Sequence, residues 1–307
     1  MEMQPVTAQP PDQLRFIFFN DHGLRAGWRL AIFFGLLFPI GFVVLALRSL
    51  APQFPRMSPY RTILGESALF LAVALTSWIM SRIEKREMGS YGLPLRRNAL
   101  SDFVVGYIVW GFLALTLLLA AMRALNVFDF GSLALHGNDI LKFGMLWGVA
   151  FLLVGFFEEY LTRGYLLQTL ADGIGFWPAA VVLACLFAWG HSFNDNETRM
   201  GILMTAVFAL FASITLRLTG SLWLAVGMHA GWDWAQSYFY GVPDSGTLTT
   251  GHLLNSDYHG PEWLSGGSAG PEGSVLVLVL LIAMSVLFAA LYRGRKTRVD
   301  GPMIVQG

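Results

Sequence analysis

Long apolar stretches recur along the whole chain. Most are close to 20 residues long and carry few charges, as a helix must to cross a hydrocarbon layer of about 30 Å. The eight stretches cover residues 28–47, 63–80, 103–122, 143 to beyond 159, 177–191, 200–216, 222–240 and 274–292, the fifth being the shortest. The pattern predicts an all-α, polytopic membrane protein in which residues 28–292 form one bundle of about eight transmembrane helices.

The composition agrees with a membrane protein. Only 13% of the 307 residues are charged, 55% are hydrophobic and the formal net charge is zero, whereas a soluble chain carries roughly 25% charged residues. The high hydrophobicity excludes a disordered chain, and the zero net charge argues against nucleic-acid binding. A single cysteine, Cys185, excludes a disulfide framework and a multi-cysteine metal site. The first 27 residues are polar or mixed, which does not fit a cleaved signal peptide.

Basic residues gather in three places that eight spans would bring to one side of the membrane. They precede the first span (Arg15, Arg25, Arg29), join the second to the third (Arg82, Lys85, Arg86, Arg96, Arg97) and follow the eighth (Arg293, Arg295, Lys296, Arg298). The segment 241–273 contains neither Lys nor Arg. The positive-inside rule then predicts a cytoplasmic N-terminal segment (1–27), a basic cytoplasmic tail (293–307) and an extracytoplasmic loop (241–273). Six spans with re-entrant pieces would also fit.

The predicted loop 241–273 is rich in glycine. It holds eight glycines, four acidic residues and two histidines. A long segment without evident secondary structure is either a functional element or a disordered connector. We expect a solvated, flexible connector, with a lid or a weak metal-binding stretch as the alternatives.

Ionisable residues interrupt three apolar stretches in the second half of the chain. Such residues are costly in a bilayer and usually face the interior of the bundle, where they have functional roles. In the sequence FFEEYLTRGY, Glu159 and Arg163 are four residues apart and can form an ion pair on one helical face. Glu158 points roughly 100° away from that face, so its charge is not cancelled by the same contact. A carboxylate in such a site is a candidate general base or acid, although all three residues could instead pin neighbouring helices together.

The other two interruptions supply two histidines and an aspartate. His191 ends the stretch CLFAWGH, and His229 and Asp233 are four residues apart in GMHAGWDW. A carboxylate beside an imidazole fixes its tautomer and orientation. Together, the six residues can activate a water and stabilise an oxyanion, as the hydrolysis of an amide requires. They could also hold a zinc ion through His191, His229 and one glutamate, and their spacing does not decide between these possibilities.

The three motifs, in this order, resemble the CAAX protease and bacteriocin-processing (CPBP, or Abi) family of intramembrane endopeptidases. That family has EExxxR, FxxxH and HxxxN or HxxxD, which match Glu158–Glu159–Arg163, Phe187–His191 and His229–Asp233. The resemblance covers about residues 144–236. It implies a bundle of eight helices that encloses a polar, water-filled cavity within the membrane.

The resemblance also implies a role for each matched residue. Glu158 would be the general base and His191 would share the attacking water, while Glu159 and Arg163 would be a charged support and His229 would donate to the oxyanion. This glutamate mechanism needs no cofactor; zinc is the alternative. Because an ionised aspartate only accepts hydrogen bonds, we expect Asp233 to orient His229. We further expect the substrate-binding residues to be Phe187, Trp232 and Trp234.

The sequence thus favours an intramembrane endopeptidase that cleaves a membrane-associated protein or peptide. Its expected partners are the lipid bilayer and that substrate, with no nucleic acid, and its expected location is a bacterial inner membrane. One alternative is a non-catalytic immunity or scaffold protein with the same fold. Another is a transporter that uses Glu158, Arg163 and the histidines as a proton relay.

Overall fold

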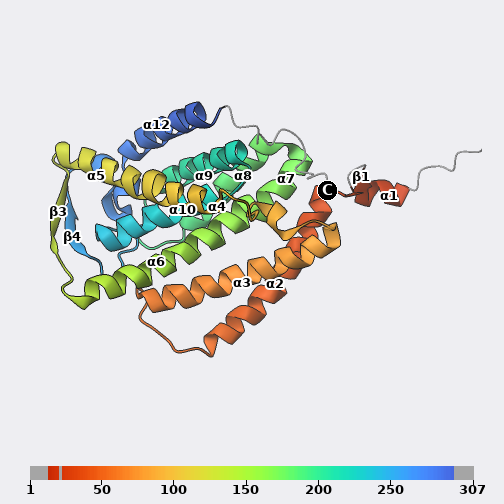
Figure 1. The fold of residues 1–307 in the computed structure, drawn as a ribbon, viewed down its shortest axis with the longest axis horizontal. Coiled ribbons are helices and arrows are strands. Elements are labelled where there is room, and N and C mark those ends of the chain that lie inside the picture. Colours follow the sequence, from red (N-terminus) through yellow and green to blue (C-terminus); the bar gives the residue numbers. More distant parts are fainter. Residues whose placement is uncertain (1–12, 21–22, 294–307) are drawn as a thin grey trace, which may run out of the picture.

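A computed structural model describes residues 13–20 and 23–293 (Figure 1). Parts of the predicted N-terminal segment and most of the predicted tail, including Arg295, Lys296 and Arg298, lie outside the described residues. Helices make up 73% of the structure. The prediction of an all-α polytopic membrane protein is therefore confirmed.

All eight predicted stretches are helical, and six helical segments of the described chain are long and apolar enough to cross a membrane. Three of the single, uninterrupted helices among these six are α2 (Ala26–Ser49), α3 (Pro59–Glu84) and α12 (Val275–Tyr292). The third span joins α4 (Ala99–Val105), the π-helix η2 (Gly106–Leu113) and α5 (Ala114–Ala124). The fourth span joins α6 (Asn138–Glu159), the π-helix η3 (Tyr160–Leu166) and α7 (Leu167–Ile174).

The remaining long helices complete the bundle. α9 (Arg199–Thr219) is the fifth span along the chain, whereas α8 (Phe176–His191) is apolar but shorter. α10 (Trp223–Asp233) continues into the π-helix η4 (Trp234–Phe239). The short elements are α1 (Gln13–Phe18), β1 (Phe19–Asn20), β2 (Gly23–Leu24), η1 (Met88–Tyr91), β3 (Phe128–Leu133), β4 (Leu254–Tyr258), α11 (Glu262–Ser265), η5 (Gly267–Ala269) and η6 (Pro271–Gly273).

Hydroxyl side chains begin three of the long helices. Ser58 caps α3 by accepting a hydrogen bond from the Arg61 amide, and Pro59 occupies the first helical position. Thr198 and Ser274 cap α9 and α12 in the same way. These local signals satisfy amide groups that no helical carbonyl can reach, so each helix starts where its sequence provides a cap.

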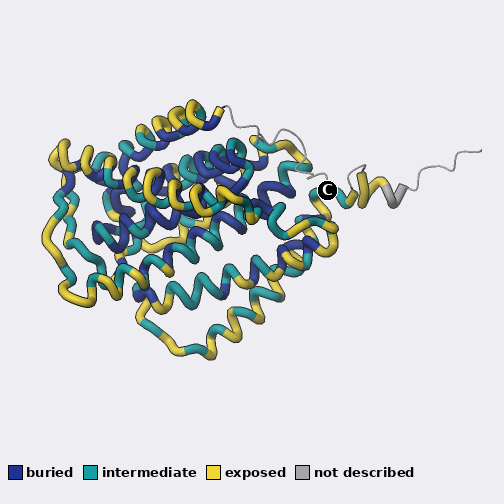
Figure 2. Tube along the Cα trace, in the orientation of Figure 1, coloured by how far each residue is buried: buried dark blue, intermediate teal, exposed yellow. Residues whose placement is uncertain are grey.

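α10 lies at the centre of the bundle, and ten consecutive residues from Leu224 to Asp233 are buried (Figures 1 and 2). Glycine makes this position possible. A Cβ on Gly227 or Gly231 would collide with the backbone of Phe103 or Tyr107, and one on Gly106 would collide with Leu224. The backbones of α10, α4 and η2 therefore touch directly, as in small-residue helix packing within membranes.

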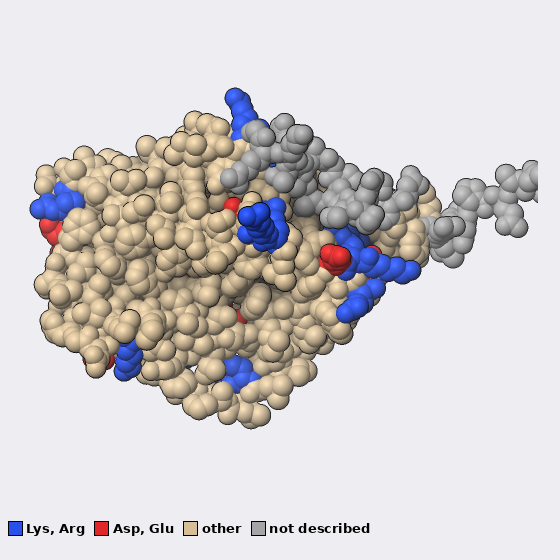
Figure 3. Space-filling model, in the orientation of Figure 1, with Lys and Arg blue, Asp and Glu red and all other residues tan. Residues whose placement is uncertain are grey.

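The outer surface is largely apolar. Charged side chains are sparse on the face shown in Figure 3. Large apolar side chains such as Phe38 and Phe42 on α2 and Val286 and Leu291 on α12 are exposed. An exposed apolar surface of this extent on long apolar helices faces lipid. The protein is an integral membrane protein.

The segment 241–273 is not the bare connector that we expected. Its strand β4 pairs antiparallel with β3, from Phe128 opposite Tyr258 to Leu133 opposite Leu254, with a bulge between them. α11, η5 and η6 follow, and Pro271 and Gly273 are buried. The prediction of a solvated connector was wrong, because backbone pairing with β3 and turns at several glycines with positive φ give this segment a structure.

Candidate active site

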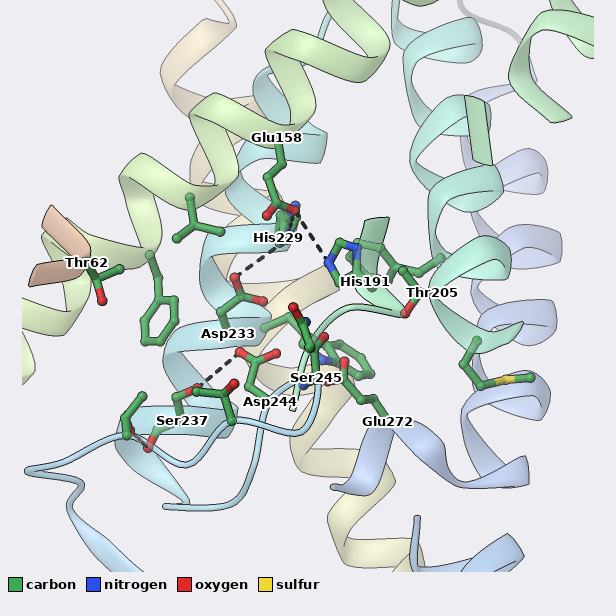
Figure 4. Close-up of a pocket in the computed structure, with 18 of the residues that line it drawn as sticks. Thr62, Glu158, His191, Thr205, His229, Asp233, Ser237, Asp244, Ser245 and Glu272 are labelled. Carbon is green, nitrogen blue, oxygen red and sulfur yellow. Dashed lines mark hydrogen bonds and ion pairs between the residues drawn. The ribbon is translucent and has the colours of Figure 1, made fainter. Parts of the chain in front are cut away.

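A cavity of about 260 Å³ lies between α6, α8, α9 and α10 and is covered by the segment 241–273 (Figure 4). The three places where ionisable residues interrupt the apolar stretches of the sequence meet in this cavity. The predicted site residues that line it are Glu158, Phe187, His191, His229, Trp232 and Asp233. Of the other three, Glu159 and Arg163 are buried behind the cavity wall and Trp234 lies away from the lining.

Glu158 faces the two histidines. Its Oε2 lies 3.7 Å from Nε2 of His229 and 4.0 Å from Nε2 of His191, and this buried oxygen accepts no hydrogen bond from a described residue. Distances of this size leave the carboxylate near both rings without a direct hydrogen bond. Glu158 is therefore free to accept a proton from a small molecule placed between the rings.

The His191 ring is held by its own helix. Its Nδ1 lies 2.9 Å from the Phe187 carbonyl oxygen, one turn earlier in α8. A carbonyl oxygen only accepts, so the proton resides on Nδ1 and the lone pair of Nε2 points toward Glu158. His191 thus offers a second acceptor beside the carboxylate.

Glu159 connects two motifs. Its Oε1 lies 2.8 Å from Nη1 of Arg163, as the sequence predicted, and it also accepts a hydrogen bond of 2.9 Å from Nδ1 of His229. The Glu159 side chain is fully buried and Arg163 is 3% exposed, so the pair is isolated from solvent. A buried charge pair of this kind holds its partners in a fixed geometry, and removing one member leaves the other uncompensated.

The orientation of His229 differs from the expected one. We expected Asp233 to orient this ring, but Nδ1 of His229 donates its hydrogen bond to Glu159, and Asp233 Oδ2 lies 3.6 Å from Nε2. Nε2 therefore faces two carboxylates, those of Glu158 and Asp233. A lone pair at Nε2 would be repelled by both, so a proton at Nε2 fits the arrangement and makes this atom a donor into the cavity.

The three aromatic residues differ in their surroundings. The Phe187 ring lies 4.7 Å from the Arg163 guanidinium and 4.4 Å from the centre of the His191 ring, so it covers the buried ion pair as well as lining the cavity. Trp232 lines the cavity and packs on Phe208. Trp234 donates its indole N–H to the Gly144 carbonyl at 2.9 Å, which ties η4 to α6. Trp234 therefore does not line the cavity, whereas Phe187 and Trp232 do.

Comparison with known proteins agrees with this arrangement. Residues 140–235 match a protein family described as type II CAAX prenyl endopeptidase Rce1-like. The chain carries an Rce1-like domain. The match includes all three motifs, and it confirms the predicted resemblance to the CPBP family. No curated protein and no solved structure matched the chain.

At the level of the family, the Rce1-like domain indicates a CAAX-type intramembrane protease, which works within a lipid bilayer on a peptide substrate. The domain contains every charged residue of the three motifs. It ends before the segment 241–273 that covers the cavity. The cover of the site is thus contributed by residues outside the matched domain.

Two acidic residues of this cover were missed in the sequence. Asp244 and Glu272 line the cavity, where Asp244 Oδ2 accepts a hydrogen bond of 3.1 Å from Ser237 and Glu272 accepts one from the amide of Ser245. Burial raises the pKa of the Asp244 carboxyl, and burial together with Asp244 raises the pKa of Glu272 well above its usual value. The sequence signal was available, because 241–273 contains acids and no basic residue.

π-helical turns directly follow two groups of site residues. η3 begins one residue after Glu159, and η4 begins one residue after Asp233. π-helical segments are rare and often occur at functional sites, since the wider turn changes which side chains share a face. Arg163 of the first motif lies within η3, so this π-helical turn sets the position of Arg163 relative to Glu159.

Zinc is the alternative that the sequence left open. Within 13–20 and 23–293, no group of three His, Cys, Asp or Glu side chains is placed to hold a metal ion. The Oε2 atom of Glu158 lies 3.7 Å from Nε2 of His229 and 4.0 Å from Nε2 of His191. We therefore derive no step through a metal, and zinc stays an alternative prediction.

Proposed function

We propose that this protein is an intramembrane endopeptidase that hydrolyses a peptide bond with a water activated by Glu158 and His191. The observation that carries the proposal is the placement of Glu158. Its Oε2 accepts no hydrogen bond from a described residue and faces Nε2 of both histidines across a cavity inside the bundle. A general base must lie within reach of the proton that it removes.

In the proposed first step, the water between Glu158 and His191 attacks the carbonyl carbon of the scissile bond. The carboxylate of Glu158 takes one proton of the water, and the carbon–oxygen double bond becomes a single bond with negative charge on oxygen. Nε2 of His229 donates a hydrogen bond to this oxyanion. Preorganised donors of this kind stabilise the transition state more than the substrate, which lowers the barrier.

In the second step, the carbon–nitrogen bond breaks and the carbonyl re-forms. Glu158 returns its proton to the leaving nitrogen, so that the carboxylate is regenerated and the products are a carboxylic acid and an amine. Glu159 and Arg163 take no proton in this scheme. They hold the His229 ring, through the hydrogen bond to Nδ1, in the position from which Nε2 can donate.

The test is the mapping of new N-termini in membrane extracts incubated with reconstituted protein. Wild type is compared with Glu158→Gln and His191→Ala, with Glu262→Gln as the control, since Glu262 is exposed on α11 and does not line the cavity. We expect new termini with wild type and the control only. If all four proteins gave the same set of N-termini, the non-catalytic binding function would be favoured. In that case the neutral Glu158→Gln variant would still bind the partner.

A chelator separates the two hydrolytic mechanisms in the same experiment. Cleavage that persists in the chelator agrees with the glutamate-activated water. Cleavage that is lost in the chelator and restored by zinc would support the metal-dependent alternative. The bond that is cleaved identifies the substrate in either case.

We also propose that both termini lie in the cytoplasm of a bacterium and that the segment 241–273 lies outside it. The α3–α4 connection, whose sequence is basic, and the β3–β4 sheet lie at opposite ends of the bundle in Figure 1, which supports this orientation under the positive-inside rule. A thiol reagent that does not cross membranes tests it with single cysteines at Asp257 and at Arg97 in a Cys185→Ala background. We expect labelling of intact cells at position 257 only.

A further inference from the structure

The cavity is lined with several acidic side chains. Four of the described residues that line it are acidic, and none of the described lining residues is Lys or Arg. The acidic residues are Glu158, Asp233, Asp244 and Glu272. The proposed mechanism uses only the first of these as a base, so three carboxyl groups remain without an assigned role.

These three carboxyl groups lie together beside the proposed catalytic centre. Figure 4 shows Glu158 and both histidines at one end of the cavity, Asp244 and Glu272 at the other, and Asp233 between them. Asp244 disfavours the ionisation of Asp233, and both Asp244 and Asp233 disfavour that of Glu272, as carboxyl groups that lie close together do. A peptide bond held at Glu158 would therefore place a neighbouring side chain among the three.

The group has few hydrogen-bond donors. Asp233 is the deepest member, with a side chain that is 7% exposed, and neither of its oxygens accepts a hydrogen bond from a described residue. Its nearest positively charged partner is His229, at 3.6 Å. Asp244 accepts from the Ser237 hydroxyl and also forms a side-chain hydrogen bond with Glu272, which accepts from the Ser245 amide. Clustered buried carboxyl groups repel one another when ionised, unless a cation lies among them.

We infer that this end of the cavity holds a Lys or Arg side chain of the substrate, and that Asp244 and Glu272 make the enzyme prefer a basic residue beside the cleaved bond. The inference rests on the proposed function, because it assigns a substrate class to the same cavity. A cation at this point contacts carboxylates from two segments, since Asp233 comes from α10 and the other two from the cover 241–273. A glutamate or a free terminal carboxylate in the same place would meet only like charge.

Binding is measured on full-length Glu158→Gln protein, so that turnover does not interfere, in nanodiscs of zwitterionic lipid. The probes are fluorescent peptides of one apolar sequence, acetylated and amidated, with a central Lys, Gln or Glu. A fourth probe has Gln at the centre and a free C-terminal carboxylate. We expect the Lys peptide to bind about tenfold more tightly than the Gln peptide, and the Glu peptide more weakly than either, as partly buried unit charges allow.

Variants identify the residues that cause the preference. In the same background, the double change Asp244→Asn and Glu272→Gln should reduce the Lys preference to about twofold or less, because most of the local negative charge is gone. The control is Asp257→Asn, an exposed acid on β4 of the same segment that does not line the cavity, and it should keep the full preference. Unchanged binding of the Gln peptide shows that each variant is folded.

The outcomes separate the inference from the proposed function. Equal binding of the Lys, Gln and Glu peptides, tighter binding of the free-carboxylate probe, or a Lys preference that survives in the double variant would overturn the inference. A Lys preference in binding, without new N-termini from wild type, would support the cation site and count against the peptidase. Cleavage of all peptides at equal rates would support the peptidase and count against the cation site.

Discussion

His229 donates a hydrogen bond of 2.9 Å to Glu159, a residue 70 positions earlier on another helix. The same carboxylate pairs with Arg163 at 2.8 Å. One buried oxygen, Oε1, thereby joins the first and third motifs and fixes the direction of the histidine ring. The second of the paired glutamates thus has a role distinct from that of Glu158, which faces the cavity.

Glu159→Gln should destabilise the protein and reduce its activity strongly. The change leaves the Arg163 charge buried without a counter-charge, which costs about 3–5 kcal/mol in comparable pairs. Thermal unfolding in detergent measures the loss. The matched control is the double change Glu159→Gln and Arg163→Met, which removes both charges and should recover part of the stability but none of the orientation of His229. A double variant as unstable as the single one would contradict this coupling.

Asp233→Asn should retain much of the proteolytic activity, whereas His229→Ala should lose most of it. The hydrogen bond that orients His229 is donated by its Nδ1 to Glu159, and Asn keeps the shape of the Asp233 side chain while removing one charge. Initial rates on the substrate identified by N-terminal mapping provide the comparison. Equal loss in the two variants would assign Asp233 a direct part in the reaction.

Gly231→Ala should destabilise the bundle by about 1–3 kcal/mol, as overpacking does in close-packed interiors. A Cβ at this position would overlap the Tyr107 backbone, which a side-chain rotation cannot relieve. Gly148→Ala on α6 is the matched control, because its Cβ would have its nearest neighbour, the Trp234 indole nitrogen, at 3.7 Å. Unfolding temperatures of the two variants should differ, and similar temperatures would disprove the direct backbone contact.

Trp232→Phe should change the KM of the proposed peptidase, and Trp234→Phe should leave KM unchanged. Trp232 lines the cavity, whereas the Trp234 indole is used in the hydrogen bond to Gly144. The loss of that hydrogen bond should appear as reduced thermal stability, by about 1 kcal/mol. A raised KM for Trp234→Phe at unchanged stability would support the expectation from the sequence that Trp234 binds substrate.

The preference for a basic peptide should grow as the pH rises from about 5 to 8. The pKa values of Asp244 and Glu272 are raised, so both carboxyl groups are protonated and uncharged at low pH, and they attract a cation only as they ionise. The double change Asp244→Asn and Glu272→Gln should flatten this dependence. The other charged groups that face the pair are Glu158, Glu197, His229 and Asp233.

These other groups are present in the double variant as well, so the difference between the two pH profiles isolates Asp244 and Glu272. The measurement is the ratio of the dissociation constants of the Lys and Gln peptides at each pH. A ratio that falls as the pH rises has the wrong sign for acidic groups and would contradict the assignment.

The sequence predicted the parts of the molecule that depend on local spacing. Apolar length identified the helices, and the interval of four residues correctly paired Glu159 with Arg163. The same interval predicted that His229 and Asp233 share one helical face, and in the structure Nε2 and Oδ2 of these residues are 3.6 Å apart. The hydrogen bond from His229 to Glu159 could not be predicted in this way, because it depends on how two helices cross.

The cover of the cavity was missed for a related reason. Ser245 and Glu272 are 27 positions apart and meet through a series of turns that have no periodic pattern. The pairing of β4 with β3 joins segments separated by more than a hundred residues. Trp234 was grouped with Trp232 by proximity in sequence, but the two indoles leave the helix in different directions at the start of η4.

The packing of α10 makes the two halves of the cavity mechanically unequal. His229 and Asp233 stand on a helix whose backbone rests directly on η2, with no side chain between them that could adjust. Asp244 and Glu272 stand on a segment in which seven glycines have positive φ, so the chain changes direction repeatedly between short elements. The two walls of the cavity are therefore held in place differently, one by direct backbone contact inside the bundle and the other by turns and by the pairing of β4 with β3. A change in the segment 241–273 would thus reshape the cover while the helix that carries the oxyanion donor keeps its position.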